Sequence, residues 1–224
     1  MTLMVKLSRP TTARGQDVIA AALMARPALA GFLIKSALMP YIGLTGLSKL
    51  SSRGEEKLLI ADLRLEDTPG DLGGLQSLSG LVSGVTVSIR LAVSRDWPFV
   101  AEALRAARIA PVLSFTWYEL EQEGLTADRV ASVARSSGIN YVMLVRPEPS
   151  LVKDLLAMAP QLSVILDGIE LGSGICIGAS YEVIGQEVLD AEDPLRSVRV
   201  TIYGQKRSAE DCEAGRQPLR AFQT

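Results

Sequence analysis

Eight short apolar stretches of strand type recur along the chain, and most are separated by segments with helical periodicity. Strands that alternate with helices form a parallel sheet, because each helix returns the chain to the start of the next strand. Eight such units favour a short closed (β/α)8 TIM-type barrel, near its lower length limit of ~200 residues. An open doubly wound sheet is the alternative, but the usual glycine-rich loop is missing after the first strand. The predicted strands are 3–7, 31–35, 57–62, 85–89, 111–115, 141–145, 162–166 and 181–184.

Seven segments have the apolar spacing of helices that cover a barrel. They are 16–24, 41–50, 72–81, 99–109, 127–136, 150–157 and 194–202. The segment between the last two strands is short and leaves little room for a helix. The residues that follow 203 are polar and of mixed charge. We therefore expect one barrel domain over 1–203 and a polar C-terminal tail over 204–224.

Histidine is absent from the chain, which excludes a Ser-His-Asp triad, a histidine-ligated metal and a histidine general base. Proton transfer would have to use Lys, Asp, Glu, Cys or Tyr. The only two cysteines, Cys176 and Cys212, lie far apart and carry no partner motif. They therefore predict neither a disulfide framework nor a zinc site.

The balance of apolar and charged residues indicates an ordinary globular protein. Hydrophobic residues make up 48% of the chain and charged residues 21%, so a sizeable core is expected. The net charge of -2, with both signs mixed, predicts neither a nucleic-acid-binding nor a membrane-binding surface. The N-terminal segment 1–7 is too short for a signal peptide, and no stretch is long enough to span a membrane. A cytoplasmic protein is expected.

Charged residues gather at the C-terminal ends of the predicted strands, where barrel enzymes carry their active sites. Asp62 and Arg64 are two residues apart, so on a regular strand their side chains point to the same side. A salt-bridge cluster that only ties strand ends together is the structural alternative. The charged residues of this rim are Lys35, Asp62, Arg64, Asp67, Arg146 and Asp167.

Four segments of the sequence resemble the orotidine 5'-monophosphate decarboxylase suprafamily. The run Asp-Leu-Arg-Leu-Glu-Asp-Thr-Pro at 62–69 is similar to the family's Asp-x-Lys-x-x-Asp-Ile-Pro, and Lys35 matches its strand-two lysine. Val-Arg-Pro-Glu at 145–148 resembles the Thr-Arg-Pro-Glu that follows strand six in archaeal members. Residues 178–194 resemble the family's closing Gly-Ala-Asp-Tyr, Val-Gly-Arg and Ala-x-Asp-Pro.

The resemblance implies a catalytic array and a homodimer. The array would be Lys35, Asp62, Arg64 and Asp67, with the last aspartate serving a site across the dimer interface. In the family the substrate carboxylate lies against the first aspartate, and the central lysine stabilises and protonates the carbanion that remains when carbon dioxide leaves. No metal or organic cofactor is needed. The implied binding set for a nucleotide monophosphate is Arg146, Gly168, Gly172, Gly174, Gly185 and Gln186.

Three features depart from the family pattern, and all lie at the implied substrate site. Arg64 replaces the central lysine, and a guanidinium keeps its proton where a lysine can donate it. Gln186 replaces the phosphate-binding arginine, while Asp167 and Glu170 would repel a dianion. Residues 116–121 are bulky and acidic where the family has a small hydroxyl residue.

Two hypotheses of different kinds follow. The first is a divergent carboxy-lyase that converts orotidine 5'-monophosphate to uridine monophosphate in pyrimidine biosynthesis. The second is a catalytically inactive or re-purposed homodimeric barrel that binds a ligand or serves as a scaffold. Sugar-phosphate chemistry, as in hexulose phosphate synthase, is a related option, but its motif also requires the lysine and a metal-binding acid.

Overall fold

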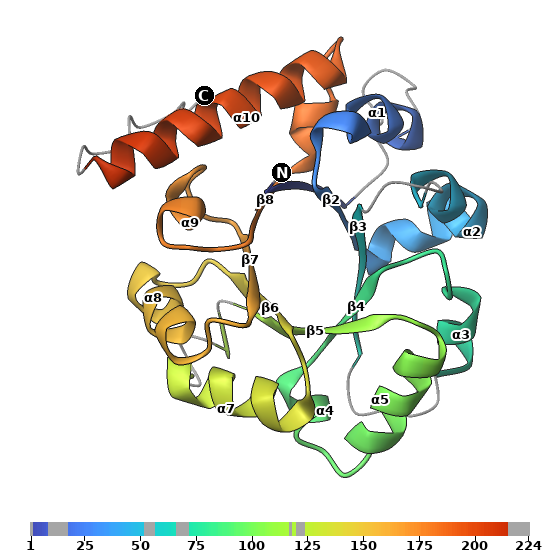
Figure 1. Ribbon diagram of the computed structural model, residues 1–224. Helices are drawn as coiled ribbons and strands as arrows, with labels where there is room; N and C mark the ends of the chain where they lie inside the picture. Colours follow the sequence, from blue (N-terminus) through green and yellow to red (C-terminus); the bar gives the residue numbers. More distant parts are fainter. Residues whose placement is uncertain are drawn as a thin grey trace.

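Eight parallel strands close into a barrel in sequence order, and β8 pairs back onto β1 (Figure 1). This computed structural model describes residues 2–8, 18–51, 57–65, 72–116, 118–119 and 124–214. The closed barrel confirms the predicted (β/α)8 fold over the open sheet. The strands are β1 (Leu3–Leu7), β2 (Gly31–Lys35), β3 (Leu58–Leu65), β4 (Gly84–Val87), β5 (Ala110–Phe115), β6 (Tyr141–Val145), β7 (Ser163–Asp167) and β8 (Tyr181–Ile184).

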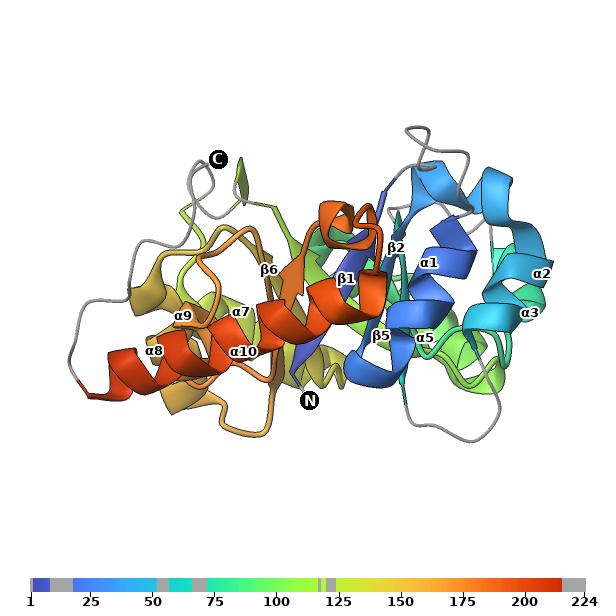
Figure 2. The same ribbon diagram turned by 90° about the horizontal axis from the view of Figure 1, so that it is seen from above.

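Helices surround the barrel, and the longest, α10, runs along one side past α9 (Figures 1 and 2). Within the described ranges, no helix combines the length and the apolar character needed to cross a membrane. The α-helices are α1 (Val18–Ala25), α2 (Met39–Leu50), α3 (Leu72–Ser77), α4 (Ile89–Ala92), α5 (Trp97–Ala106), α7 (Ala127–Ser137), α8 (Pro149–Met158), α9 (Ser173–Cys176) and α10 (Pro194–Glu213). Short 3-10 helices are η1 (Arg26–Ala28), η2 (Ser36–Leu38) and η4 (Gln186–Leu189).

Four strands have the predicted bounds, namely β1, β2, β6 and β8. The other four differ from the predicted bounds by one to three residues at one or both ends. The strand expected to reach Ile89 ends at Val87, because the Ser88 side chain accepts a hydrogen bond from Leu91 N at 3.2 Å and starts α4. The last helix, expected to end near Ile202, continues to Glu213. The predicted tail is therefore helical over its first ten residues, and 215–224 lie outside the described residues.

Side chains alternate between the barrel interior and the helix layer, as parallel strands require. Apolar residues fill the lower interior, namely Met4, Leu33, Ile60, Val112, Met143, Ile165 and Val183. At the next inward positions toward the C-terminal ends, Val145 is apolar, and the polar residues are Lys6, Lys35, Asp62, Thr86, Ser114 and Asp167. An apolar base thus supports a polar mouth.

Cys176 at the end of α9 and Cys212 near the end of α10 form a disulfide with a Cα–Cα distance of 6.1 Å. This corrects the expectation of no disulfide. The β7–β8 connection is as short as predicted and holds only the four-residue α9. The pairing was not visible in the sequence because it depends on α10 passing beside α9 (Figure 1).

Removal of this crosslink by Cys212→Ser is expected to destabilise the protein by about 3–4 kcal/mol. The reason is that the bond spans 36 residues and restricts the unfolded chain. The melting temperature, followed by circular dichroism, should fall by roughly 8–12 °C. Cys176→Ser is the matched variant and should have the same melting temperature as Cys212→Ser. Reductant should lower the melting temperature of wild type to that of the two variants. Equal melting temperatures of all three proteins without reductant would mean that the disulfide is absent in solution.

Candidate functional site

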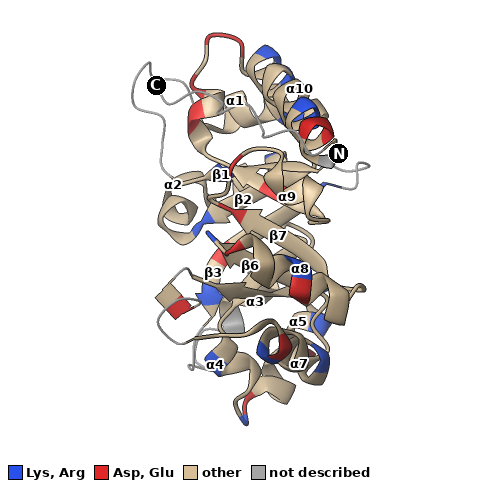
Figure 3. Cartoon of the chain, turned by 90° about the vertical axis from the view of Figure 1, so that its left-hand side faces the viewer, with Lys and Arg blue, Asp and Glu red and all other residues tan. Residues whose placement is uncertain are grey.

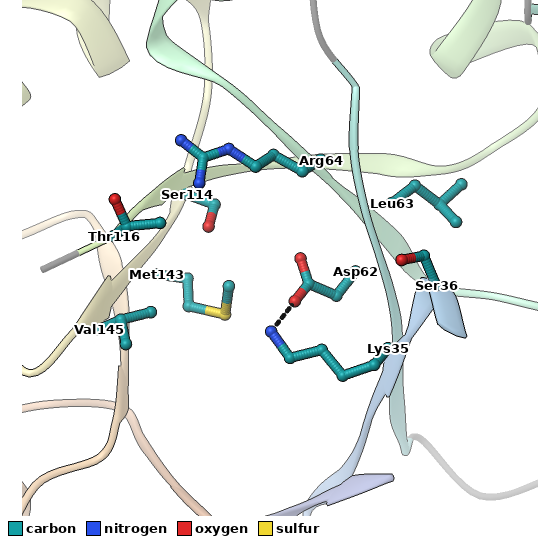
Figure 4. Close-up of a pocket in the computed structure, with 9 residues that line it drawn as sticks. All are labelled: Lys35, Ser36, Asp62, Leu63, Arg64, Ser114, Thr116, Met143 and Val145. Atoms are coloured by element: carbon teal, nitrogen blue, oxygen red, sulfur yellow. Dashed lines mark hydrogen bonds and ion pairs between the residues drawn. The ribbon is translucent and has the colours of Figure 1, made fainter. Parts of the chain in front are cut away.

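Lys35 and Asp62 meet at the C-terminal ends of neighbouring strands. They are register partners between β2 and β3, and Lys35 Nζ forms an ion pair with Asp62 Oδ2 (Figure 4). The second carboxylate oxygen, Oδ1, accepts a hydrogen bond of 2.7 Å from Thr86 Oγ1 on β4. Asp62 is buried while Lys35 is partly exposed. The carboxylate is therefore held from two sides, with the ammonium nearer the solvent.

Arg64 does not join this pair. Its φ of 47° is in the left-handed region, which is uncommon for a residue with a side chain, and the β3–β4 register shifts between Ala61 and Leu65. The irregularity breaks the alternation on which the sequence argument relied. The guanidinium lies near Ser114 and Thr116 rather than beside Asp62 (Figure 4).

Arg64 pairs with Glu119, which was not among the predicted site residues. Arg64 Nη2 forms an ion pair with Glu119 Oε1. Thr116 N and Thr116 Oγ1 each donate to Glu119 Oε2 at 2.8 Å, and Glu119 N donates back to Thr116 Oγ1 at 3.3 Å. This reciprocal arrangement is a capping box, and the Thr-x-x-Glu spacing was the available sequence signal.

Glu119 stays ionised at neutral pH. Burial acts to raise the pKa of its carboxyl, but the hydrogen bonds from Thr116 and the charge of Arg64 outweigh burial and lower the pKa below its usual value. The Arg64–Glu119 pair therefore persists at neutral pH. It ties the end of β3 to the segment that follows β5.

Lys6 and Asp167 form another ion pair at the mouth. Lys6 Nζ lies 2.8 Å from Asp167 Oδ1 and 2.9 Å from Oδ2. The sequence analysis treated Asp167 as a charge that repels phosphate, but Lys6 balances it. The signal for Lys6 was a single lysine inside the apolar strand Leu-Met-Val-Lys-Leu, which the sequence analysis did not use.

A cavity of about 230 Å³ opens at this mouth. It is smaller than the ~300–1,000 Å³ of ordinary ligand pockets. One part of its wall carries charged and hydroxyl groups, and another is apolar. The lining residues are Lys35, Ser36, Asp62, Leu63, Arg64, Ser114, Thr116, Met143 and Val145 (Figure 4). Asp67, the fourth residue of the implied array, lies outside the described residues.

Charged side chains cover two of the glycines assigned to phosphate binding. A Cβ atom built on Gly168 would lie 2.8 Å from Arg146 Cγ, and one built on Gly185 would lie 2.0 Å from a Glu187 carboxylate oxygen. The exposed Arg146 has a φ of 53°, and its N–H donates to Asp167 O at 2.8 Å. Arg146 therefore stands beside Asp167 at the rim, whereas Gly185 faces a carboxylate.

Gln186 is buried rather than displayed in the mouth. Its Oε1 accepts a hydrogen bond of 3.0 Å from Ser8 N, at the end of β1. The side chain that stands at the family's arginine position thus fixes the chain after β1.

Gly172 and Gly174 lie against α10 and the buried Glu182, away from the mouth. A Cβ on Gly172 would lie 2.5 Å from Ser208 Cβ, and one on Gly174 would lie 2.8 Å from Glu182 Oε1. Gly172 N and Ile175 N donate to the Glu182 carboxylate at 2.9 and 3.0 Å. Backbone N–H groups of this loop, which resemblance assigns to phosphate, therefore bind a carboxylate of the protein itself.

Acidic and basic positions lie side by side around β2, β3 and β6 (Figure 3). Three ion pairs lie at this rim, and each joins one cation to one carboxylate: Lys6–Asp167, Lys35–Asp62 and Arg64–Glu119. Among the residues that the structure describes, no three His, Cys, Asp or Glu side chains lie close enough to hold a metal ion.

Comparisons with known proteins find no matching family model and no matching curated protein. Among solved structures, the orotidine 5'-monophosphate decarboxylase of Sulfolobus solfataricus superposes with a TM-score of 0.74 at 16% identity, over 92% of this chain and 98% of that one. The chain has the orotidine 5'-monophosphate decarboxylase fold. The enzyme of Metallosphaera sedula superposes with a TM-score of 0.72 at 17% identity, over 92% of this chain and 98% of that one. A 3-hexulose-6-phosphate synthase gives 0.62 at 20% identity, over 93% and 99%.

At these identities the likeness is one of fold. The orotidine 5'-monophosphate decarboxylase fold accounts for the closed barrel and for a mouth at the C-terminal ends of the strands. The side chains of this mouth decide its chemistry.

Proposed function

We propose that this protein is a divergent barrel of the orotidine 5'-monophosphate decarboxylase type. Its rim binds a small ligand at the Lys35–Asp62 pair and does not decarboxylate orotidine 5'-monophosphate at an ordinary enzymatic rate. The observation that carries the proposal is that Arg64, at the position of the family's central lysine, pairs with Glu119 and not with Asp62.

The chemistry of decarboxylation supports this assignment. The carbanion that remains when carbon dioxide leaves needs a nearby positive charge and a proton donor. Arg64 supplies a charge that Glu119 already neutralises, and its guanidinium does not give up a proton at neutral pH. Among the residues that the structure describes, the mouth thus keeps a place for a ligand, while the arginine in the central position does not supply the proton that completes the reaction.

The groups around the implied phosphate position support it as well. Glu182 occupies the N–H groups of Gly172 and Ile175, and the carboxylate of Glu187 lies over Gly185. A phosphate dianion placed there would meet carboxylates rather than N–H donors. Phosphate therefore contributes little to binding in this proposal.

Slow orotidine 5'-monophosphate decarboxylation is the second candidate. It is favoured by the Lys35–Asp62 pair, because Thr86 orients that carboxylate and a preorganised charge pair stabilises a transition state without reorganisation. Such a protein would be a weak carboxy-lyase of pyrimidine biosynthesis that needs neither metal nor organic cofactor. Steady-state turnover of orotidine 5'-monophosphate by the purified protein separates the two candidates.

We further propose that the protein is a homodimer, because the family resemblance assigns Asp67 to the site of a second copy. Sedimentation equilibrium at micromolar concentration should give twice the chain mass of 24.0 kDa. A single species at the mass of one chain would contradict this expectation and would leave each rim without the partner's Asp67.

A further inference from the structure

We propose that Lys6 and Asp167 form the second half of the rim site, and that the ligand is a small carboxylate that carries no phosphate. This inference rests on the proposed function in taking the mouth as the ligand site. It adds a pair of binding residues on β1 and β7 and names the class of ligand.

The two lysine–aspartate pairs occupy equivalent places in the barrel. Lys6 and Asp167 stand on β1 and β7, and Lys35 and Asp62 stand on β2 and β3, all at inward positions near the C-terminal ends. The mouth of one chain therefore contains two lysines and two aspartates. Lys6 and Asp167 are not among the residues that line the cavity. Asp167 is the register partner of Val145, which does line it, so this pair lies next to the cavity wall.

In both pairs the cation faces the solvent more than the anion does. The side chains of Asp167 and Asp62 are 4% and 8% exposed, whereas those of Lys6 and Lys35 are 28% and 35% exposed. An ammonium has three N–H donors and no acceptor. A ligand that enters the mouth therefore meets the N–H donors of the lysines first. A ligand group with acceptor oxygens can accept hydrogen bonds from them.

A carboxylate matches these donors better than a phosphate does. Lys6, Lys35 and Arg64 are each paired with one carboxylate, so these three cations offer little net positive charge to a dianion. Glu182 lies against Gly172 and Gly174, and Glu187 lies against Gly185, three of the four glycines that would cradle phosphate. A carboxylate carries a single charge and two oxygens, and one lysine on each side of the mouth can donate to it.

Four pyrimidine probes separate the carboxylate from the phosphate. Orotate carries a carboxylate alone, uridine monophosphate a phosphate alone, orotidine 5'-monophosphate both, and uracil neither. Calorimetric titration of the intact protein should show binding of orotate, no gain from the phosphate of orotidine 5'-monophosphate, and no binding of uracil or uridine monophosphate at the same concentration.

The residue test is the double variant Lys6→Met with Asp167→Leu, which removes both charges together and leaves no buried charge without its partner. It should bind orotate at least about tenfold more weakly, the loss expected for one charge-assisted hydrogen bond. Lys6→Arg should keep most of the affinity. Lys153→Met, at an exposed position on α8, is the matched control and should bind as wild type does.

Melting curves of the variants check that each is folded. The inference is overturned if wild type does not bind orotate at millimolar concentration, if uridine monophosphate binds as tightly as orotate, or if the double variant binds orotate as wild type does. Rapid turnover of orotidine 5'-monophosphate would instead overturn the proposed function, so the two failures are distinguishable.

Discussion

Purified protein is expected to decarboxylate orotidine 5'-monophosphate far more slowly than the ~1–1,000 turnovers per second of ordinary enzymes. Two charge-assisted contacts are missing, one to the reacting carbon and one to the phosphate. Each such contact contributes about 1.5–3 kcal/mol, and ~1.4 kcal/mol is a factor of ten in rate. Their loss alone would lower the rate roughly 10²–10⁴-fold. Arg64, in the place of the central lysine, is a poor proton donor and would lower the rate further. A steady-state assay at saturating substrate measures this directly.

Substitution at Arg64 sharpens the test. Arg64→Lys alone should not restore turnover, because Glu119 would hold the new ammonium and the phosphate position stays blocked by carboxylates. Arg64→Lys combined with Glu119→Gln frees that ammonium, so this double variant should turn over orotidine 5'-monophosphate faster than Arg64→Lys alone. Arg64→Met with Glu119→Gln is the control, because it has no cation at this position. Wild-type turnover in the ordinary range would show that Arg64 does not limit the reaction and would refute the proposed function.

Glu182→Ala should cause the largest loss of stability. Glu182 is 1% exposed and accepts hydrogen bonds from Gly172 N at 2.9 Å, Ile175 N at 3.0 Å and Gln205 Nε2 at 2.7 Å. Its removal leaves three donors in the interior without an acceptor, at a cost of about 3–5 kcal/mol. The melting temperature should fall by roughly 8–16 °C.

The matched control for this change is Glu187→Ala. Glu187 is an exposed acid on the same segment of chain, so its removal should change the free energy of unfolding by no more than about 0.5 kcal/mol. Glu182→Gln keeps the size of the side chain and one acceptor oxygen. Its loss in free energy of unfolding should lie between those of Glu182→Ala and Glu187→Ala. Equal urea midpoints for Glu182→Ala and Glu187→Ala would show that the buried carboxylate does not organise the β7–β8 loop.

Sequence alone determined the repeating pattern of this protein. Eight apolar stretches of strand length alternate with seven segments of helical periodicity, and local backbone preference with side-chain periodicity is sufficient to define such elements. The meeting of Lys35 and Asp62 also followed, because both stand at the C-terminal ends of consecutive strands. Two helix starts are local as well, because the side chains of Thr126 and Asp193 accept hydrogen bonds from Arg129 N and Arg196 N, three residues later.

Only the tertiary structure decided which distant residues meet. The register shift in β3 directs Arg64 toward Glu119, 55 residues later, and barrel closure brings Lys6 to Asp167, 161 residues later. Because α10 continues past Ile202, Gln205 donates a hydrogen bond to Glu182, and Cys212 forms the disulfide with Cys176. Such contacts depend on strand register and on the path of a helix over the barrel, and both are set by packing of the whole chain rather than by any short stretch of sequence.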